Sequence, residues 1–180
     1  MIPAAGLSRR QGGPNKLLGP YGETTVIGAT VAAVRRCVAD VVVVTGRDAS
    51  SVAAAAVGAR AVFNPAYEEG LGSSIAAGVA ACPAANGVMI VLGDMPGVRE
   101  DVIRGALEVF RSSAEDVIVA VRYAEMADRP GHPIVFGPSY RSDLLGLSGD
   151  RGGREILRAH SSRVLLVEAG GFLRDVDSEG

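Results

Sequence analysis

The sequence contains no tryptophan, and aromatic residues make up only 4% of its 180 residues. A core without many rings must be built from aliphatic side chains, and hydrophobic residues account for 48% of the chain. That content excludes an intrinsically disordered chain. The length suits one domain with a sizeable core, so we expect residues 1–180 to form a single domain.

An excess of charge of either sign is also lacking, because 18 Lys and Arg stand against 20 Asp and Glu, for a net charge of −2. This balance gives no support for nucleic-acid binding through bulk electrostatics. No apolar run is long enough to cross a bilayer, and no signal segment is present. We therefore expect a cytoplasmic protein with neither nucleic acid nor membrane as a partner.

Cysteine is scarce as well, with two residues, Cys37 and Cys82, both in segments rich in Ala and Val. Neither has the neighbours that a metal site would need. We expect both to be small core residues in a reducing compartment.

What the sequence does contain is a series of unbroken apolar runs, at 41–45, 88–94 and 116–121. Such runs are typical of strands buried on both faces of a parallel sheet. Further strands are expected at 1–4, 59–65, 132–137 and 163–169, and helices at 24–37, 48–57, 72–82, 99–111, 138–147 and 152–160. This alternation predicts an α/β protein with a single doubly wound, Rossmann-like, mostly parallel sheet and helices on both faces.

The stretch "AAGLSRRQGGPNK", residues 4–16, follows the first predicted strand. Ligands of doubly wound folds bind at the carboxyl ends of the strands. Glycines in the stretch let main-chain N–H groups approach an anion, and Arg9, Arg10 and Lys16 add positive charge. The glycine spacing fits neither GxGxxG nor a Walker A loop, which argues against a nicotinamide dehydrogenase. On these residues alone the stretch is either a phosphate-binding loop or an ordinary surface turn.

The stretch resembles the signature AAGxSxRMGxxK of the MobA-like NTP-transferase family, with Gln11 where methionine is usual. The resemblance implies the nucleotide-diphospho-sugar transferase type of fold and one NTP-transferase domain over 1–180. It also implies that Arg10 and Lys16 neutralise the phosphates of a nucleoside triphosphate and act in catalysis. The implied nucleotide-binding residues of this loop are Ala4, Ala5, Gly6, Ser8, Gly12, Gly13 and Lys16.

Asp94 stands at the end of the predicted strand 88–94, in "VLGDMP". On its own this residue could cap the turn before Pro96. The resemblance makes it a catalytic residue and a ligand of Mg²⁺, because the family motif GDxP carries the metal-binding aspartate. The closing "RDVDSEG" is similar to the family's DxDTPED, which implies Asp177 as second metal ligand, with Asp175 as the alternative.

Three more segments are similar to the cytidylyltransferase branch that acts on molybdenum cofactor. "NPAYEEGLGSSIAAG" (64–78) implies nucleotide contacts from Ser73 and Ser74, although these serines could simply cap the next helix. "GHPIVFG" and "GDRGGREIL" imply acceptor-side positions for His132 and Asp150. His132 precedes a proline and could instead order a loop.

The sequence departs from the family pattern at its start, where the first strand is short or begins upstream, and at "GGPNK", whose spacing is that of the guanylyltransferase branch. Ala5 favours CTP, because AAG accompanies CTP in the family and AGG accompanies GTP. We expect transfer of CMP to a phosphorylated pterin-type acceptor, with a molybdoenzyme as possible client. GTP, a sugar-phosphate acceptor, or a non-catalytic module that delivers a cofactor remain alternatives.

Overall fold

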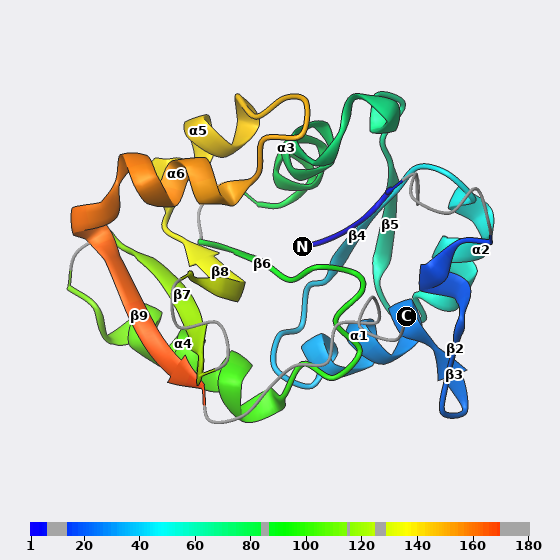
Figure 1. The fold of residues 1–180 in the computed structure, drawn as a ribbon, viewed down its shortest axis with the longest axis horizontal. Coiled ribbons are helices and arrows are strands. Elements are labelled where there is room, and N and C mark those ends of the chain that lie inside the picture. Colours follow the sequence, from blue (N-terminus) through cyan, green and yellow to red (C-terminus); the bar gives the residue numbers. More distant parts are fainter. Residues whose placement is uncertain (7–13, 84–86, 115, 125–128, 170–180) are drawn as a thin grey trace.

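The computed structural model describes residues 1–6, 14–83, 87–114, 116–124 and 129–169 (Figure 1). The strands are β1 (Ile2–Ala4), β2 (Pro20–Tyr21), β3 (Thr24–Thr25), β4 (Val42–Thr45), β5 (Arg60–Phe63), β6 (Val88–Ile90), β7 (Ile118–Tyr123), β8 (Gly131–Phe136) and β9 (Val164–Ala169). The α-helices are α1 (Val26–Arg35), α2 (Ala49–Ala55), α3 (Leu71–Ala81), α4 (Glu100–Ser112), α5 (Arg141–Leu145) and α6 (Gly153–Ala159). The β2–β3 pair is a small hairpin set apart from the main sheet.

The main sheet consists of two groups of strands joined at the centre. One group has the order β1-β4-β5 and the other the order β6-β8-β7-β9. The N–H groups of Val91 and Gly93 donate to the carbonyls of Met1 and Pro3, at 3.1 and 3.2 Å. These bonds place β1 beside β6, so the strand order across the molecule is β5-β4-β1-β6-β8-β7-β9.

Most strand pairs are parallel, and β8 runs antiparallel to both β6 and β7. Helices cover both faces. Alternate strand residues enter two separate apolar clusters: Val43 of β4 joins one cluster, while Val42 and Val44 join the other. The first cluster packs against α1, α2 and α4, and the second against α3, α5 and α6 (Figure 1). The predicted doubly wound, mostly parallel sheet is confirmed.

Two local expectations need correction. The predicted strand 88–94 is regular only over Val88–Ile90, because the chain beyond it bonds to β1 on one side alone. The helix predicted over 48–57 is regular only over Ala49–Ala55, and its N-cap residue Asp48 adopts a left-handed conformation (φ 56°) in which its side chain forms no cap hydrogen bond. Its carboxylate instead accepts a hydrogen bond from Asn15 at 3.3 Å.

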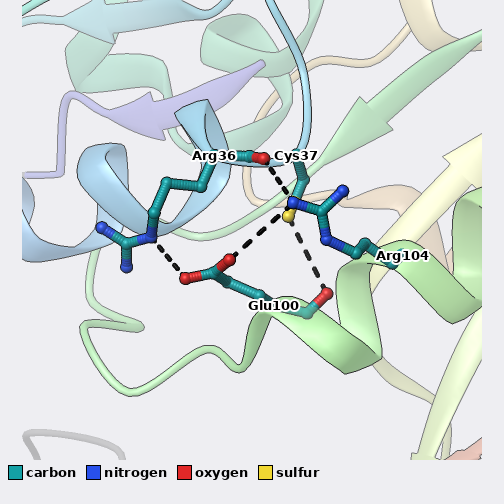
Figure 2. Close-up of polar contacts among 4 residues, drawn as sticks. All are labelled: Arg36, Cys37, Glu100 and Arg104. Atoms are coloured by element: carbon teal, nitrogen blue, oxygen red, sulfur yellow. Dashed lines mark hydrogen bonds and ion pairs between the residues drawn. The ribbon is translucent and has the colours of Figure 1, made fainter.

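A polar cluster fastens the end of α1 to the start of α4 (Figure 2). The Arg36 guanidinium bonds to the carboxylate of Glu100, and Nη2 of Arg104 donates to the Arg36 carbonyl at 2.6 Å. The thiol of Cys37 lies 3.8 Å from the Glu100 carbonyl. Because Glu100 follows Asp94 closely in the chain, this cluster braces the segment that leads away from Asp94.

The surroundings of the two cysteines and the length of the helices bear on the expectations that were drawn from composition. Cys37 and Cys82 are both unpaired and partly buried, each against one of the two apolar clusters. This placement agrees with their expected role as small packing residues. Within the part of the chain that the structure describes, no helix is both long and apolar enough to cross a membrane.

Candidate active site

Lys16 opens a short 3-10 helix, Lys16–Leu18, and has buried neighbours on both sides. Asn15 is 5% exposed. Its Oδ1 accepts from the N–H of Leu17 at 3.1 Å, and its Nδ2 donates to Asp48. Leu17 belongs to the apolar core. Because both neighbours are anchored, the backbone of Lys16 is fixed while its side chain remains 34% exposed.

Asp94 is positioned by the residue before it. The N–H of Gly93 donates to the Pro3 carbonyl at 3.2 Å, and its carbonyl accepts from Oγ1 of the buried Thr30 at 3.1 Å. A Cβ at position 93 would lie 3.0 Å from the same Pro3 carbonyl, so this approach favours glycine. The carboxylate bonds to Lys16 rather than to a turn N–H. The geometry therefore does not support the turn-capping alternative for Asp94.

The structure brings the predicted lysine and aspartate together: Nζ of Lys16 lies 2.8 Å from Oδ2 of Asp94. They meet because β1, which precedes the lysine loop, lies beside the chain that leads to Asp94. The two side chains are 34% and 21% exposed, so solvent and ligands can reach them. An ion pair this exposed contributes only about 0.2–1 kcal/mol to stability. Each charge can therefore exchange its partner for a ligand group at small cost.

The residues at the end of β1 pack tightly against Gly46 and Tyr67 and form a wall, the side of the site beside the Lys16–Asp94 pair. Ala4 and Ala5 are each 2% exposed, while Gly6 is exposed. A Cβ at Gly46 would lie 2.9 Å from the Ala5 methyl and 2.5 Å from the side chain of Tyr67. The buried methyls leave the main-chain groups of Ala4, Ala5 and Gly6 as the parts that a nucleotide could contact.

Ser73 and Ser74 lie inside the first turn of α3, whose N-cap position is Gly70. The alternative interpretation, that these serines only cap this helix, is therefore wrong. Nδ2 of the buried Asn64 donates to the Ser73 and Ser74 hydroxyls at 3.0 and 3.2 Å, and Ser73 donates to the Ala66 carbonyl at 2.8 Å. The two hydroxyls thus fix the start of α3 to the end of β5. Their predicted contact with nucleotide remains a prediction.

Asp150 is exposed and lies against the start of α3. Its Oδ1 is 2.5 Å from the place that a Cβ on Gly70 would occupy, and the neighbouring Gly149 carbonyl accepts from the N–H of Gly72 at 2.8 Å. Gly70 has φ 121°, a conformation that favours glycine. The structure therefore places Asp150 beside the Ser73 segment. Its expected acceptor-side role stays a prediction.

His132 lies at the start of β8, where the antiparallel direction brings it to the carboxyl end of β6. Its Nδ1 is 3.2 Å from the carbonyl oxygen of Ile90. The pKa of His132 is lowered to about 4, mainly by burial and to a smaller extent by the positive charge of Arg154, while the Ile90 hydrogen bond and the charge of Asp94 partly oppose the shift. The ring is neutral at physiological pH, and Asp94 and Arg154 are both near enough to act on it.

The remaining predicted site residues, Ser8, Arg10, Gly12, Gly13 and Asp177, lie outside the described residues. Within the described ranges, no group of three or more His, Cys, Asp or Glu side chains could hold a metal ion. Of the two predicted metal ligands, the described residues therefore include one carboxylate, that of Asp94, and a cation there would take its other ligands from outside this set, phosphate oxygens and water among them. That mixed coordination is what Mg²⁺ prefers in phosphate chemistry.

Sequence reasoning missed several residues that shape the site: Asn15, Thr30, Asn64, Tyr123 and Arg154. Asn15 and Asn64 each adjoin a proline, and Asn64 was interpreted only as the end of a strand. Thr30 is hidden in an apolar helical pattern. The sequence could have indicated a role for both asparagines, because an Asn next to an apolar strand or helix often forms a side-chain hydrogen bond to main-chain groups nearby.

The lowered pKa of His132 predicts a pH dependence of stability. The unfolded chain binds a proton on this histidine below about pH 6.5 and the folded protein only near pH 4. The unfolded state therefore holds more protons between these values, and the free energy of unfolding rises with pH across this window, by roughly 2–3 kcal/mol from this group. Denaturant unfolding of wild type and His132→Gln at pH 4.5 and 7.5 measures the difference.

His160→Gln is the matched control, because His160 is partly exposed and its Nε2 lies 2.9 Å from the Asp143 carboxylate. We expect wild type and His160→Gln to gain more stability than His132→Gln as the pH rises. Equal gains in wild type and His132→Gln would contradict a histidine that the fold keeps neutral.

With the geometry established, comparison with known proteins places the site in a family. A family model described as the MobA-like NTP transferase domain matches residues 1–164. The chain is 32% identical over 176 residues to nicotine blue oxidoreductase of Paenarthrobacter nicotinovorans, covering 93% of this chain and 85% of that protein.

Solved structures agree. Rv0371c of Mycobacterium tuberculosis H37Rv superposes with a TM-score of 0.84 at 32% identity, covering 98% of this chain and 90% of that one. A nucleotidyl transferase from Methanothermobacter gives a TM-score of 0.78 at 27% identity, covering 93% and 85%. The predicted nucleotide-diphospho-sugar transferase type of fold is thus confirmed. Because the family model spans most of its length, this chain belongs to the MobA-like NTP transferase family of nucleotidyltransferases.

Proposed function

We propose that this protein transfers CMP from CTP to the phosphate of a pterin-type acceptor, molybdopterin or its molybdenum-loaded form, and releases pyrophosphate. The observation that carries the proposal is the 2.8 Å contact between Lys16 and Asp94 at the carboxyl ends of β1 and β6. It supports the proposal because an ammonium group, which we assign to phosphate, and a carboxylate, which we assign to a metal, meet where ligands of this class of fold bind.

The reaction needs no nucleophile from the protein. An oxygen of the acceptor phosphate attacks the α-phosphorus of CTP, the bond from that phosphorus to the bridging oxygen breaks, and pyrophosphate leaves with the electron pair. Negative charge grows on the leaving group, and Lys16 offsets it once its ammonium exchanges Asp94 for phosphate oxygens. Positioning and electrostatics supply most of the catalysis in such transfers.

A divalent cation, Mg²⁺ in our proposal, would be held by Asp94, and by Asp177 as the second carboxylate. When bound, it would neutralise charge on the triphosphate. Asp94 suits this role, since it is a partly exposed carboxylate whose partner is a displaceable lysine. A structure of the related Rv0371c is a complex with manganese, which supports use of a divalent metal here.

The choice of CTP rests on Ala5, whose buried methyl packs near Gly46 and Tyr67. The acceptor side is assigned to His132 and Asp150, and the exposed Arg154 supplies positive charge near His132 for an anionic acceptor.

We further propose that residues 1–180 act as one NTP-transferase domain and that a molybdoenzyme receives the product. GTP as donor and a sugar phosphate as acceptor are the alternatives within the same chemistry.

A second candidate function comes from the relative whose name is nicotine blue oxidoreductase, which is 32% identical to this chain. An oxidoreductase of this kind would bind a redox cofactor, yet the loop at residues 4–16 lacks the GxGxxG spacing of nicotinamide-binding folds.

A non-catalytic module that binds nucleotide and delivers a cofactor is the third candidate. Release of pyrophosphate from CTP and molybdopterin would exclude that module.

Replacement of the proposed metal ligand gives a direct test. In Asp94→Asn, pyrophosphate release from CTP and molybdopterin should fall by at least about 100-fold, because the neutral amide holds the cation poorly. The unfolding free energy should change by less than about 1 kcal/mol, since the lost ion pair is exposed.

The matched control is Asp101→Asn, because Asp101 is also paired with an arginine, Arg99, but lies on the surface with 62% of its side chain exposed. It should keep wild-type activity. If Asp94→Asn retains full activity, the metal assignment is wrong.

A thermal-shift comparison separates the candidate nucleotides and cofactors. With Mg²⁺ present, CTP at 100 times its Kd should stabilise the native state by about 2.7 kcal/mol and raise the melting temperature. GTP and NADPH at the same concentration should raise it less. A larger shift with GTP would move the assignment to a guanylyltransferase, and a shift with NADPH alone would favour the oxidoreductase.

A further inference from the structure

The proton on the His132 ring can be placed from its hydrogen bond. Nδ1 lies 3.2 Å from the Ile90 carbonyl oxygen. A carbonyl oxygen can only accept, so Nδ1 must carry the proton and donate it. In a neutral imidazole the other nitrogen then holds a lone pair. Nε2 of His132 is therefore a hydrogen-bond acceptor.

This lone pair is available to a ligand. Among the described residues, Nε2 has no hydrogen-bond partner, since the ring's one bond is made by Nδ1. It is also absent from the buried unpartnered atoms of the described chain, which are Oδ1 of Asp116 and Nη1 of Arg141. His132 is half-buried and Nε2 is not among the fully buried atoms, so a ligand can reach this nitrogen, near enough to Asp94 and Arg154 for their charges to act on the ring.

The fold holds the ring in place from its backbone side. The hydroxyl of the buried Tyr123 donates to the His132 carbonyl at 2.6 Å. A Cβ at Gly131 would lie 3.0 Å from the Tyr123 ring, so the ring packs closely under the chain there. With the carbonyl bound to Tyr123 and Nδ1 bound to Ile90, the direction of Nε2 is determined.

We propose that His132 is a specificity-determining residue, whose Nε2 accepts a hydrogen bond from an N–H or O–H group of the acceptor substrate. This inference rests on the proposed function and deepens it by stating which chemistry the acceptor carries beside its phosphate. The neutral ring does not bind the acceptor phosphate by charge, a role that the proposed function gives to Arg154. If the acceptor carried only hydrocarbon next to its phosphate, Nε2 would have no hydrogen-bond donor in the complex. Tyr123 is a positioning residue that acts through His132.

Coordination of the metal by His132 fits the site less well. Mg²⁺ prefers oxygen ligands. In the described part of the chain, His132 and Asp94 also form no group of three or more His, Cys, Asp or Glu that could hold a metal. The lone pair is therefore assigned to the substrate.

The tautomer can be tested without any activity. The chain has two histidines, so ¹⁵N-histidine labelling gives a spectrum of two rings, assigned with His160→Gln. We expect His132 to show a protonated Nδ1 and a bare Nε2 unchanged from pH 5.5 to 8. The charged groups near it are Asp94 and Arg154. A proton on Nε2, or titration within this range, would overturn the proposal.

The ligand contact is tested by adding molybdopterin to the labelled protein with Mg²⁺ and the non-reactive analogue α,β-methylene-CTP. We expect the His132 Nε2 resonance to move upfield as it accepts a hydrogen bond. Bound molybdopterin with an unmoved Nε2 resonance contradicts the proposal. Failure of molybdopterin to bind at all instead contradicts the acceptor assigned under the proposed function, while the tautomer result stands.

Kinetics provide the independent readout. In His132→Leu the KM for molybdopterin should rise about 10- to 100-fold, the range expected for losing one hydrogen bond of this kind, while the KM for CTP stays the same. His132→Gln, whose amide oxygen can accept in place of Nε2, should recover most of the loss. Tyr123→Phe should raise the same KM less than His132→Leu does. Equal KM values in wild type and His132→Leu would overturn the assignment.

Discussion

The contact between Lys16 and Asp94 depends on main-chain pairing at the centre of the sheet. The hydrogen bonds from Val91 and Gly93 to Met1 and Pro3 bring the end of β1 beside the end of β6. The loop that carries Lys16 leaves from one strand and Asp94 follows the other. That adjacency brings a cation and a carboxylate from distant parts of the chain to within 2.8 Å of each other.

The surroundings of this pair divide the site into two sides. On one side the wall of Ala5, Gly46 and Tyr67 and the anchored start of α3 form a rigid boundary suited to a nucleotide. On the other side β8 runs antiparallel, so its first residues, rather than its last, reach the same edge of the sheet. This reversal is what brings His132 to the site as a neutral ring, with its proton fixed by Ile90.

The strands and the helices on both faces could be predicted from the sequence, because buried parallel strands leave unbroken apolar runs and the helices between them keep their own period. The positions of Lys16 in the segment that follows β1 and of Asp94 in the segment that follows β6 were also predictable. The hydrogen-bond partners were not predictable: Ser73 and Ser74 were assigned to nucleotide, with helix capping as the alternative, and only the fold shows that Asn64 binds both hydroxyls. The tautomer of His132 likewise depends on a carbonyl 42 residues away, which no local pattern reveals.

A protein that joins a nucleotide to a phosphorylated acceptor must move the α-phosphorus of CTP to that acceptor. This transfer is followed with CTP that carries ³²P at the α-position, in the presence of Mg²⁺ and molybdopterin. We expect the label to move to the acceptor in a new phosphoanhydride while unlabelled pyrophosphate is released in equal amount. Label that stays in CTP, or that appears only as free CMP, would contradict this transfer.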